Sequence, residues 1–247
     1  METENFSRDR ALVLGAMAGI TLAGWAYLYW EAHTMNCARW VSAGTMWNLP
    51  GFVTMLIMWC IMMVAMMAPS AAPMMVTFAI VNRRRRERSA PNVPVAVFFL
   101  GYVTVWTAFS ALATIAQFWL TSVRLLSMSM ASASPVFAGC LLIGVGFFQW
   151  TPWKQRCLAH CAGPLHFLMS AWREGWSGAL RMGVQHGSYC LGCCWALMAL
   201  LFVAGVMNLL WVAILSLFVL AEKLTPKFVS RPSGAIMAAA GAWLLFQ

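Results

Sequence analysis

Long apolar stretches constrain this chain more than any other feature of its sequence. Several reach roughly 20 residues, the length that a helix needs to cross about 30 Å of hydrocarbon. Lipid offers no hydrogen-bond partner to the backbone, so such stretches must be helical unless they close into a barrel, and the alternation of barrel strands is not seen in the sequence. Only 9% of the 247 residues are charged, against about a quarter in soluble domains. The sequence therefore predicts an all-α protein, a polytopic bundle of transmembrane helices.

The apolar stretches predict about six or seven spans. The first four cover residues 11–30, 52–76, 93–120 and 135–150. Residues 190–221 are too long for one span, and "GVMNLLW" near their middle predicts a hairpin. The last stretch, 234–246, is short, and whether it crosses decides between the two counts.

We expect one integral membrane domain over residues 1–247. Within it, residues 1–10 form a polar tail, and residues 154–189 form a polar and amphipathic connecting segment. The first apolar stretch is interpreted as a retained helix, because no small-residue cleavage site follows it convincingly. Within the connecting segment, residues 167–183 predict an amphipathic stretch at the membrane surface.

The positive charges predict the orientation. The run "NRRRRERS" is the densest basic segment and favours the cytoplasmic side, together with Arg8 and Arg10 near the N-terminus. We therefore expect a multi-pass protein with a cytoplasmic N-terminus. The net charge of +9 reflects this topology and does not indicate nucleic-acid binding, since the juxtamembrane basic residues equally suit anionic lipid headgroups.

Cysteine and histidine gather in two short segments that hold three of the four histidines and five of the eight cysteines. Residues three and four apart share a helix face, and both segments have this spacing: Cys157, His160 and Cys161, followed by His166, and then His186, Cys190, Cys193 and Cys194. Neither segment has the haem-attachment order or the paired spacing of a zinc ribbon. We expect one metal site built from both segments.

A methionine-rich segment, "MLIMWCIMMVAMMAPSAAPMM" (residues 55–75), adds further soft donors. Thioether and thiolate ligands select Cu(I), so copper is the predicted metal, while zinc, iron and haem remain open. Met62 and Met66 are weaker candidates, because methionine in a membrane helix also serves as packing. Glu222, beside a late apolar run, is a further weak candidate; it is a metal ligand, an ion-pair partner or a proton-handling group.

Two other uses of the soft side chains stay open. An outer loop with His33, Met35 and Cys37 could collect copper. The cysteines of residues 157–194 could instead form disulfides if the topology were inverted, whereas a reducing cytoplasm disfavours them in the predicted one.

Three motifs in order resemble a known family: "MMVAMMAPSAAPM", "GFFQWTPWKQRCLAHCAGP" and "GVQHGSYCLGCCWALMALLFVAGVMNLLWVAILSLFVLAEK". The chain resembles a bacterial family of predicted metal-binding integral membrane proteins, a domain of unknown function, over nearly its whole length from the first helix onward. The resemblance implies a metal site at Cys157, His160, Cys161, His186, Cys190, Cys193 and Cys194. It also implies a place in the bacterial inner (cytoplasmic) membrane, and a small soluble or membrane-associated partner protein.

The sequence leaves the function between three classes. The first is copper handling or delivery through Cys, His and Met ligands, for which exchangeable soft donors are suited. The second is a subunit of a copper-dependent membrane oxidoreductase or monooxygenase, which would act on a hydrophobic substrate together with a partner protein. The third is a structural membrane subunit whose clustered cysteines have no metal-binding role. Four histidines are few for copper catalysis, so the sequence favours handling and leaves enzymatic activity open. No phosphate loop or nucleophile motif is present, and no catalytic residue is assigned.

Overall fold

A computed structural model of the chain describes residues 2–34, 49–87, 93–126, 134–206 and 208–246. These residues form helices without β-strands, in agreement with the predicted all-α class. The helices are α1 (Glu2–Thr34), α3 (Leu49–Arg86), α4 (Val95–Ser122), α5 (Pro135–Phe148), α6 (Pro152–Ala162), α7 (Pro164–Ala171), α8 (Gly175–Ala199), α9 (Leu201–Ala204), α10 (Leu209–Leu224) and α11 (Pro226–Leu245). Met35 and Cys37 of the predicted outer loop lie outside the described residues.

Four helical segments among the described residues are long and apolar enough to cross a membrane: Ser7–Thr34, Leu49–Arg86, Val95–Ser122 and Gly175–Ala204. Helices α5 and α6 form a fifth candidate only if taken as one span, because they meet at a bend of 66°. The predicted count of six or seven is thus not confirmed. The predicted final stretch belongs to α11, and α10 has 16 residues, fewer than a full span needs.

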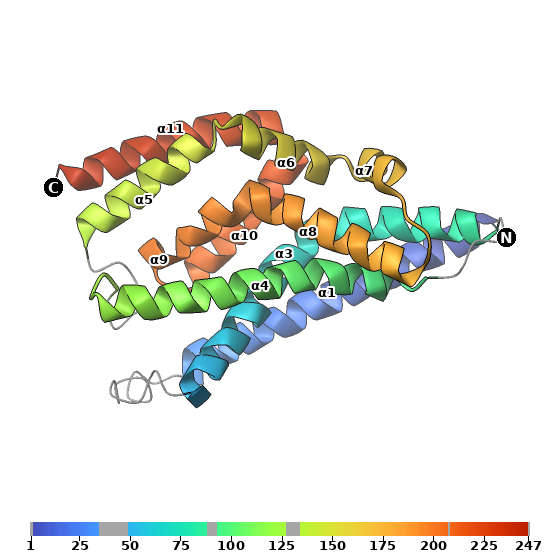
Figure 1. Cartoon of the computed structure of the whole chain (residues 1–247), viewed down its shortest axis with the longest axis horizontal. Helices are drawn as coiled ribbons and strands as arrows, with labels where there is room; N and C mark the ends of the chain where they lie inside the picture. The colour runs from blue at the N-terminus through green and yellow to red at the C-terminus, as the bar shows by residue number, and fades with distance from the viewer. Residues whose placement is uncertain (1, 35–48, 88–92, 127–133, 207, 247) are drawn as a thin grey trace.

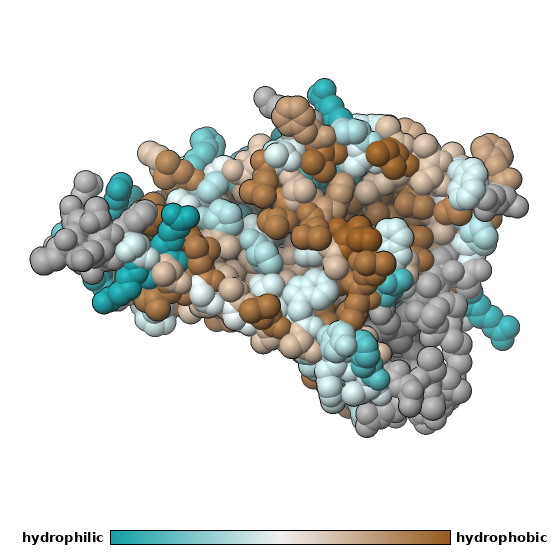
Figure 2. Space-filling model, turned by 180° about the vertical axis from the view of Figure 1, so that it is seen from behind, coloured by the Kyte–Doolittle hydropathy of each residue, from teal (hydrophilic) through white to brown (hydrophobic). Residues whose placement is uncertain are grey.

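The outer surface of the bundle is apolar in the way that a lipid-facing surface requires. Leu22, Leu112 and Leu217 expose 69%, 65% and 66% of their surface, and such large apolar surface is rare on soluble monomers. Figure 2 shows hydrophobic side chains over the middle of one face and hydrophilic side chains toward its ends. This distribution fits a protein whose middle lies in hydrocarbon.

Glycines let α4 and α8 pack closely along their length (Figure 1). A Cβ atom at Gly183 of α8 would overlap the backbone of Phe98, and one at Gly101 of α4 would overlap that of Leu180. Small residues at such crossings allow two backbones to approach, as is usual for membrane helices. The close crossing fixes Tyr102 and Trp106 of α4 against the face of α8 that carries the cysteines.

A turn is present within residues 190–221, as predicted, but the two membrane crossings expected on either side of it are not confirmed. The chain turns after α9 at Gly205, whose φ of 94° suits glycine, and Asn208 caps the start of α10 by accepting a hydrogen bond from the Trp211 backbone N–H. The predicted amphipathic stretch 167–183 is instead divided. Its first part lies in α7, the chain bends at residues 172–174, and the remainder is the first part of α8, where Ala179 and Met182 are buried.

Candidate metal centre

Helix α3 presents a buried face of methionines to the centre of the bundle. Its sequence places methionine at helical spacing, and seven of these side chains have an exposed fraction of 1% or less: Met55, Met58, Met62, Met63, Met66, Met67 and Met75. Pro69 and Pro73 lie inside the same helix, where each removes one backbone N–H. The side chains of the weak candidates Met62 and Met66 therefore point into the protein interior.

Helix α8 presents thiols to the same interior. Cys190, Cys193 and Cys194 are completely buried, and His186 lies one turn earlier with an exposed fraction of 1%. The Sγ atoms of Cys193 and Cys194 donate to the Cys190 carbonyl at 3.1 and 2.8 Å. The i, i+3 and i, i+4 spacing predicted from the sequence thus places these side chains on one side of one helix.

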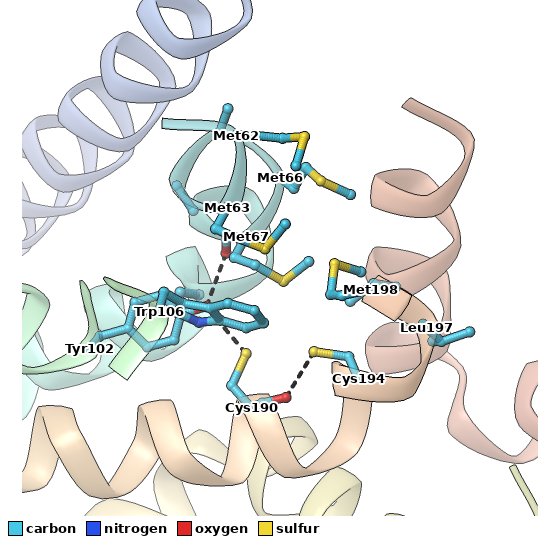
Figure 3. Close-up of a cluster of buried hydrophobic side chains, with 14 of the residues drawn as sticks. Met62, Met63, Met66, Met67, Tyr102, Trp106, Cys190, Cys194, Leu197 and Met198 are labelled. Carbon is cyan, nitrogen blue, oxygen red and sulfur yellow. Dashed lines mark hydrogen bonds between the residues drawn. The ribbon is translucent and has the colours of Figure 1, made fainter. Parts of the chain in front are cut away.

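The thiols of α8 face the methionines of α3 in the buried space between the two helices, where these side chains pack together (Figure 3). The Tyr102 hydroxyl joins the two helices, because it donates to the Met67 carbonyl at 3.3 Å and lies 3.2 Å from the Cys190 Sγ. Met198, one turn after Cys194 on α8, adds a thioether to the same space. We call this group the sulfur centre: Met63, Met67, Cys190, Cys194 and Met198.

Cys161 of α6 extends the sulfur centre. Helix α6 packs against α8, and the Cys161 thiol interacts with Cys190 and Cys193, so the two Cys/His segments lie side by side. That they build one metal site stays a prediction. Cys157, one turn earlier, is buried beside Gly192 of α8 and close to the Trp153 side chain. The seven cysteines among the described residues are all free thiols.

Lys223 of α10 places a cation at the sulfur centre. Its Nζ donates to the Cys190 Sγ at 3.1 Å and to the Ser70 Oγ of α3 at 2.7 Å. The side chain is buried, and a buried ammonium group requires compensating partners. A negatively charged copper–thiolate group next to Lys223 would supply that compensation.

His186 is a buried polar residue whose two ring nitrogens both lack a partner among the described residues. The ring lies between Phe98, Tyr102 and Phe167. A buried imidazole without partners is costly. Its position one turn from Cys190 makes it a free nitrogen donor beside the sulfur centre.

The remaining candidates lie elsewhere. The His160 ring stacks on Tyr189 with ring centroids 4.3 Å apart, and its Nδ1 lies 2.8 Å from the Arg156 carbonyl oxygen. His166 is an exposed residue of α7.

Glu222 is an ion-pair partner in this structure. Both of its carboxylate oxygens lie within 2.8 Å of the Lys154 Nζ, and the Ser230 hydroxyl donates to Oε1 at 2.6 Å. Its oxygens are thus occupied by α6 and α11, although its neighbour Lys223 reaches the sulfur centre.

The donor set fits a soft metal only when the thioethers are included. Among the described residues, no three His, Cys, Asp or Glu side chains stand in an arrangement that could hold a metal ion together. Thiols paired with thioethers are the donors that select Cu(I), and this pairing is what the sulfur centre offers. The sequence did not point to Tyr102, Lys223 or Met198, because nothing in their local pattern indicates which distant residues they contact.

Comparisons with known proteins identify the family. Residues 56–244 match the family model PpoB2, described as a copper chaperone. No curated protein and no solved structure matches the chain. The match covers α8 and all of α3 from residue 56 onward, and with them every residue of the sulfur centre. This chain therefore belongs to the PpoB2 copper chaperone family.

Proposed function

We propose that this protein is an integral membrane copper chaperone that holds Cu(I) at the sulfur centre and passes it to a partner protein. The observation that carries the proposal is the placement of Cys190 and Cys194 of α8 opposite the buried methionines of α3. The family match supports copper as the cargo. Thiolates and thioethers bind Cu(I) in preference to hard cations.

The surroundings of the sulfur centre suit a copper–thiolate group. Two thiolates and one Cu(I) ion carry a net charge of −1, which the Lys223 ammonium beside Cys190 balances. The Lys223 Nζ donates a hydrogen bond to this sulfur, and the Tyr102 hydroxyl, whose proton goes to the Met67 carbonyl, lies 3.2 Å from it. Such charge-assisted hydrogen bonds are strong in a buried site, so the neighbours of Cys190 favour the loaded state.

The methionine face of α3 offers a route toward the thiols. Met55, Met58, Met62 and Met66 are all buried and follow one another at intervals of three or four residues. Consecutive side chains at this spacing are neighbours on the helix. We propose that Cu(I) moves along these weak thioether ligands, each of which releases the ion easily, before the thiols retain it.

The proposal places the protein in the bacterial inner membrane with a cytoplasmic N-terminus. The basic run of α3, Arg83–Arg86, supports this orientation through the positive-inside rule. Delivery requires an acceptor, for which a small soluble or membrane-associated protein is proposed. The alternative of a copper-dependent oxidoreductase subunit is not favoured by the family match.

The test is copper binding by purified protein in detergent. The variants Cys190→Ser and Cys194→Ser are loaded anaerobically with Cu(I), passed over a desalting column and analysed for copper by mass spectrometry. Cys140→Ser is the matched control, since Cys140 is an exposed thiol on α5. We expect the control to retain the wild-type copper content and the two variants to lose most of theirs. Equal copper content in all three variants would refute the sulfur centre as the site.

A further inference from the structure

A pocket lined by basic side chains lies where α1, α3 and the start of α4 meet. Its volume is about 460 Å³, within the range of sites for small molecules. The pocket lies more than two turns further along α3 than Ser70, which accepts a hydrogen bond from Lys223 at the sulfur centre. Hydrophilic side chains gather at this end of the molecule, which carries the N-terminus (Figure 2).

The pocket has an excess of positive charge. Its charged lining residues are Arg8, Asp9, Arg83 and Arg86. Arg83 is already engaged, because its Nη1 donates to Asp9 at 2.8 Å and its Nε donates to the exposed Glu87 at 3.4 Å. Among the described residues no carboxylate pairs with Arg8 or Arg86. Two guanidinium groups are therefore available to an anion.

The first turn of α4 adds uncapped backbone donors to the same pocket. Pro94 and Val95 line it, and α4 has no side-chain cap at its N-terminus. The Asn82 side chain holds the approach to this helix by donating to the Val93 carbonyl at 2.7 Å. Free N–H groups and the helix dipole make such a terminus a favourable place for a phosphate oxygen, and the two guanidiniums stand at the same pocket.

One wall of the pocket is apolar. Leu12 and Val13 belong to the first apolar stretch of α1, and Val93 with Ala79 continues the wall toward α3 and α4. A free phosphate ion would make no favourable contact with these aliphatic side chains. A phospholipid would use both parts, because its headgroup phosphate meets the arginines while its glycerol backbone and the first part of its acyl chains lie against the aliphatic side chains.

We propose that this pocket binds one anionic phospholipid, with the phosphate held by Arg8, Arg86 and the first turn of α4. The pocket lies where the apolar part of α1 gives way to its polar end, which is the depth of a lipid headgroup. Basic pockets between helices at the membrane surface bind anionic headgroups in this manner. The proposal does not depend on the copper site, since the two share no residue.

The test is native mass spectrometry of the purified full-length protein, titrated with phosphatidylglycerol in detergent. Removing one arginine near a headgroup costs about fivefold in affinity, the factor that corresponds to about 1 kcal/mol. We expect Arg86→Gln to lower phosphatidylglycerol occupancy by about this factor. The matched control is Arg84→Gln, an exposed arginine two positions earlier that does not line the pocket, and it should stay within twofold of the wild type.

Competition separates a lipid from a free anion. We expect phosphatidylcholine to bind far more weakly than phosphatidylglycerol, and millimolar inorganic phosphate not to displace the bound lipid. An equal loss in Arg84→Gln and Arg86→Gln would overturn the proposal, because the binding would then reflect general surface charge. Displacement by inorganic phosphate alone would also overturn it and would assign the pocket to a free anion.

Discussion

The buried ion pair between Lys154 and Glu222 predicts a large loss of stability when one partner is removed. The two side chains are 0% and 1% exposed, and the Lys154 Nζ lies 2.7 and 2.8 Å from the two carboxylate oxygens. In Lys154→Met the carboxylate keeps its contact with Ser230 but loses its cation. Breaking such a buried pair on one side costs about 3–5 kcal/mol, because the remaining charge stays buried without compensation.

The assay is the free energy of unfolding in detergent micelles, measured by SDS titration with tryptophan fluorescence. The matched control is Arg85→Gln, which removes the exposed pair between Arg85 and Glu174 and is expected to cost about 1 kcal/mol or less. The double variant Lys154→Met with Glu222→Leu removes both charges, so it should be markedly more stable than Lys154→Met. If Lys154→Met costs no more than Arg85→Gln, the reasoning about this buried pair is wrong.

Two further predictions concern the crossing of α4 with α8 and the role of His186. Gly183→Ala places a Cβ against the backbone of Phe98 and should destabilise the protein by about 1–3 kcal/mol, which would lower the thermal unfolding midpoint. In the control Gly144→Ala the new Cβ meets open space, so the midpoint should not fall. Equal midpoints for the two variants would contradict the packing argument. His186→Phe removes an imidazole that has no hydrogen-bond partner among the described residues. The copper-free variant should therefore be at least as stable as the wild type. Its affinity for Cu(I), measured by competition with a chelator, should fall. His166→Phe is the control for affinity, and an unchanged affinity in His186→Phe would exclude that ring as a ligand.

The sequence was sufficient to predict the features that depend on local pattern. Helical spacing predicted that Cys190 and Cys194 share a side of one helix, and "GVMN" predicted the turn that the structure places at Gly205. Methionines recur at intervals of three or four residues between Met55 and Met66 in the sequence, and the burial of these side chains is the structural finding. Each of these features is fixed by residues within a few turns of one another.

Contacts between distant helices could not be predicted in the same way. Whether Glu222 binds metal or forms an ion pair depends on Lys154, which lies 68 residues earlier. The contact of Lys223 with Cys190 requires α10 to fold back on α8 after the hairpin. The span count also depended on tertiary structure, because α5 and α6 meet at a bend that hydrophobicity does not reveal.

The central claim is that copper in this protein is held by sulfur between α3 and α8. X-ray absorption spectroscopy at the copper K-edge of Cu(I)-loaded, full-length protein tests it most directly. We predict an edge typical of Cu(I) and a first coordination shell dominated by sulfur, which is lost in a Cys190→Ser, Cys194→Ser double variant and retained in Cys140→Ser. A first shell made only of nitrogen and oxygen, or one unchanged in the double variant, would contradict the account.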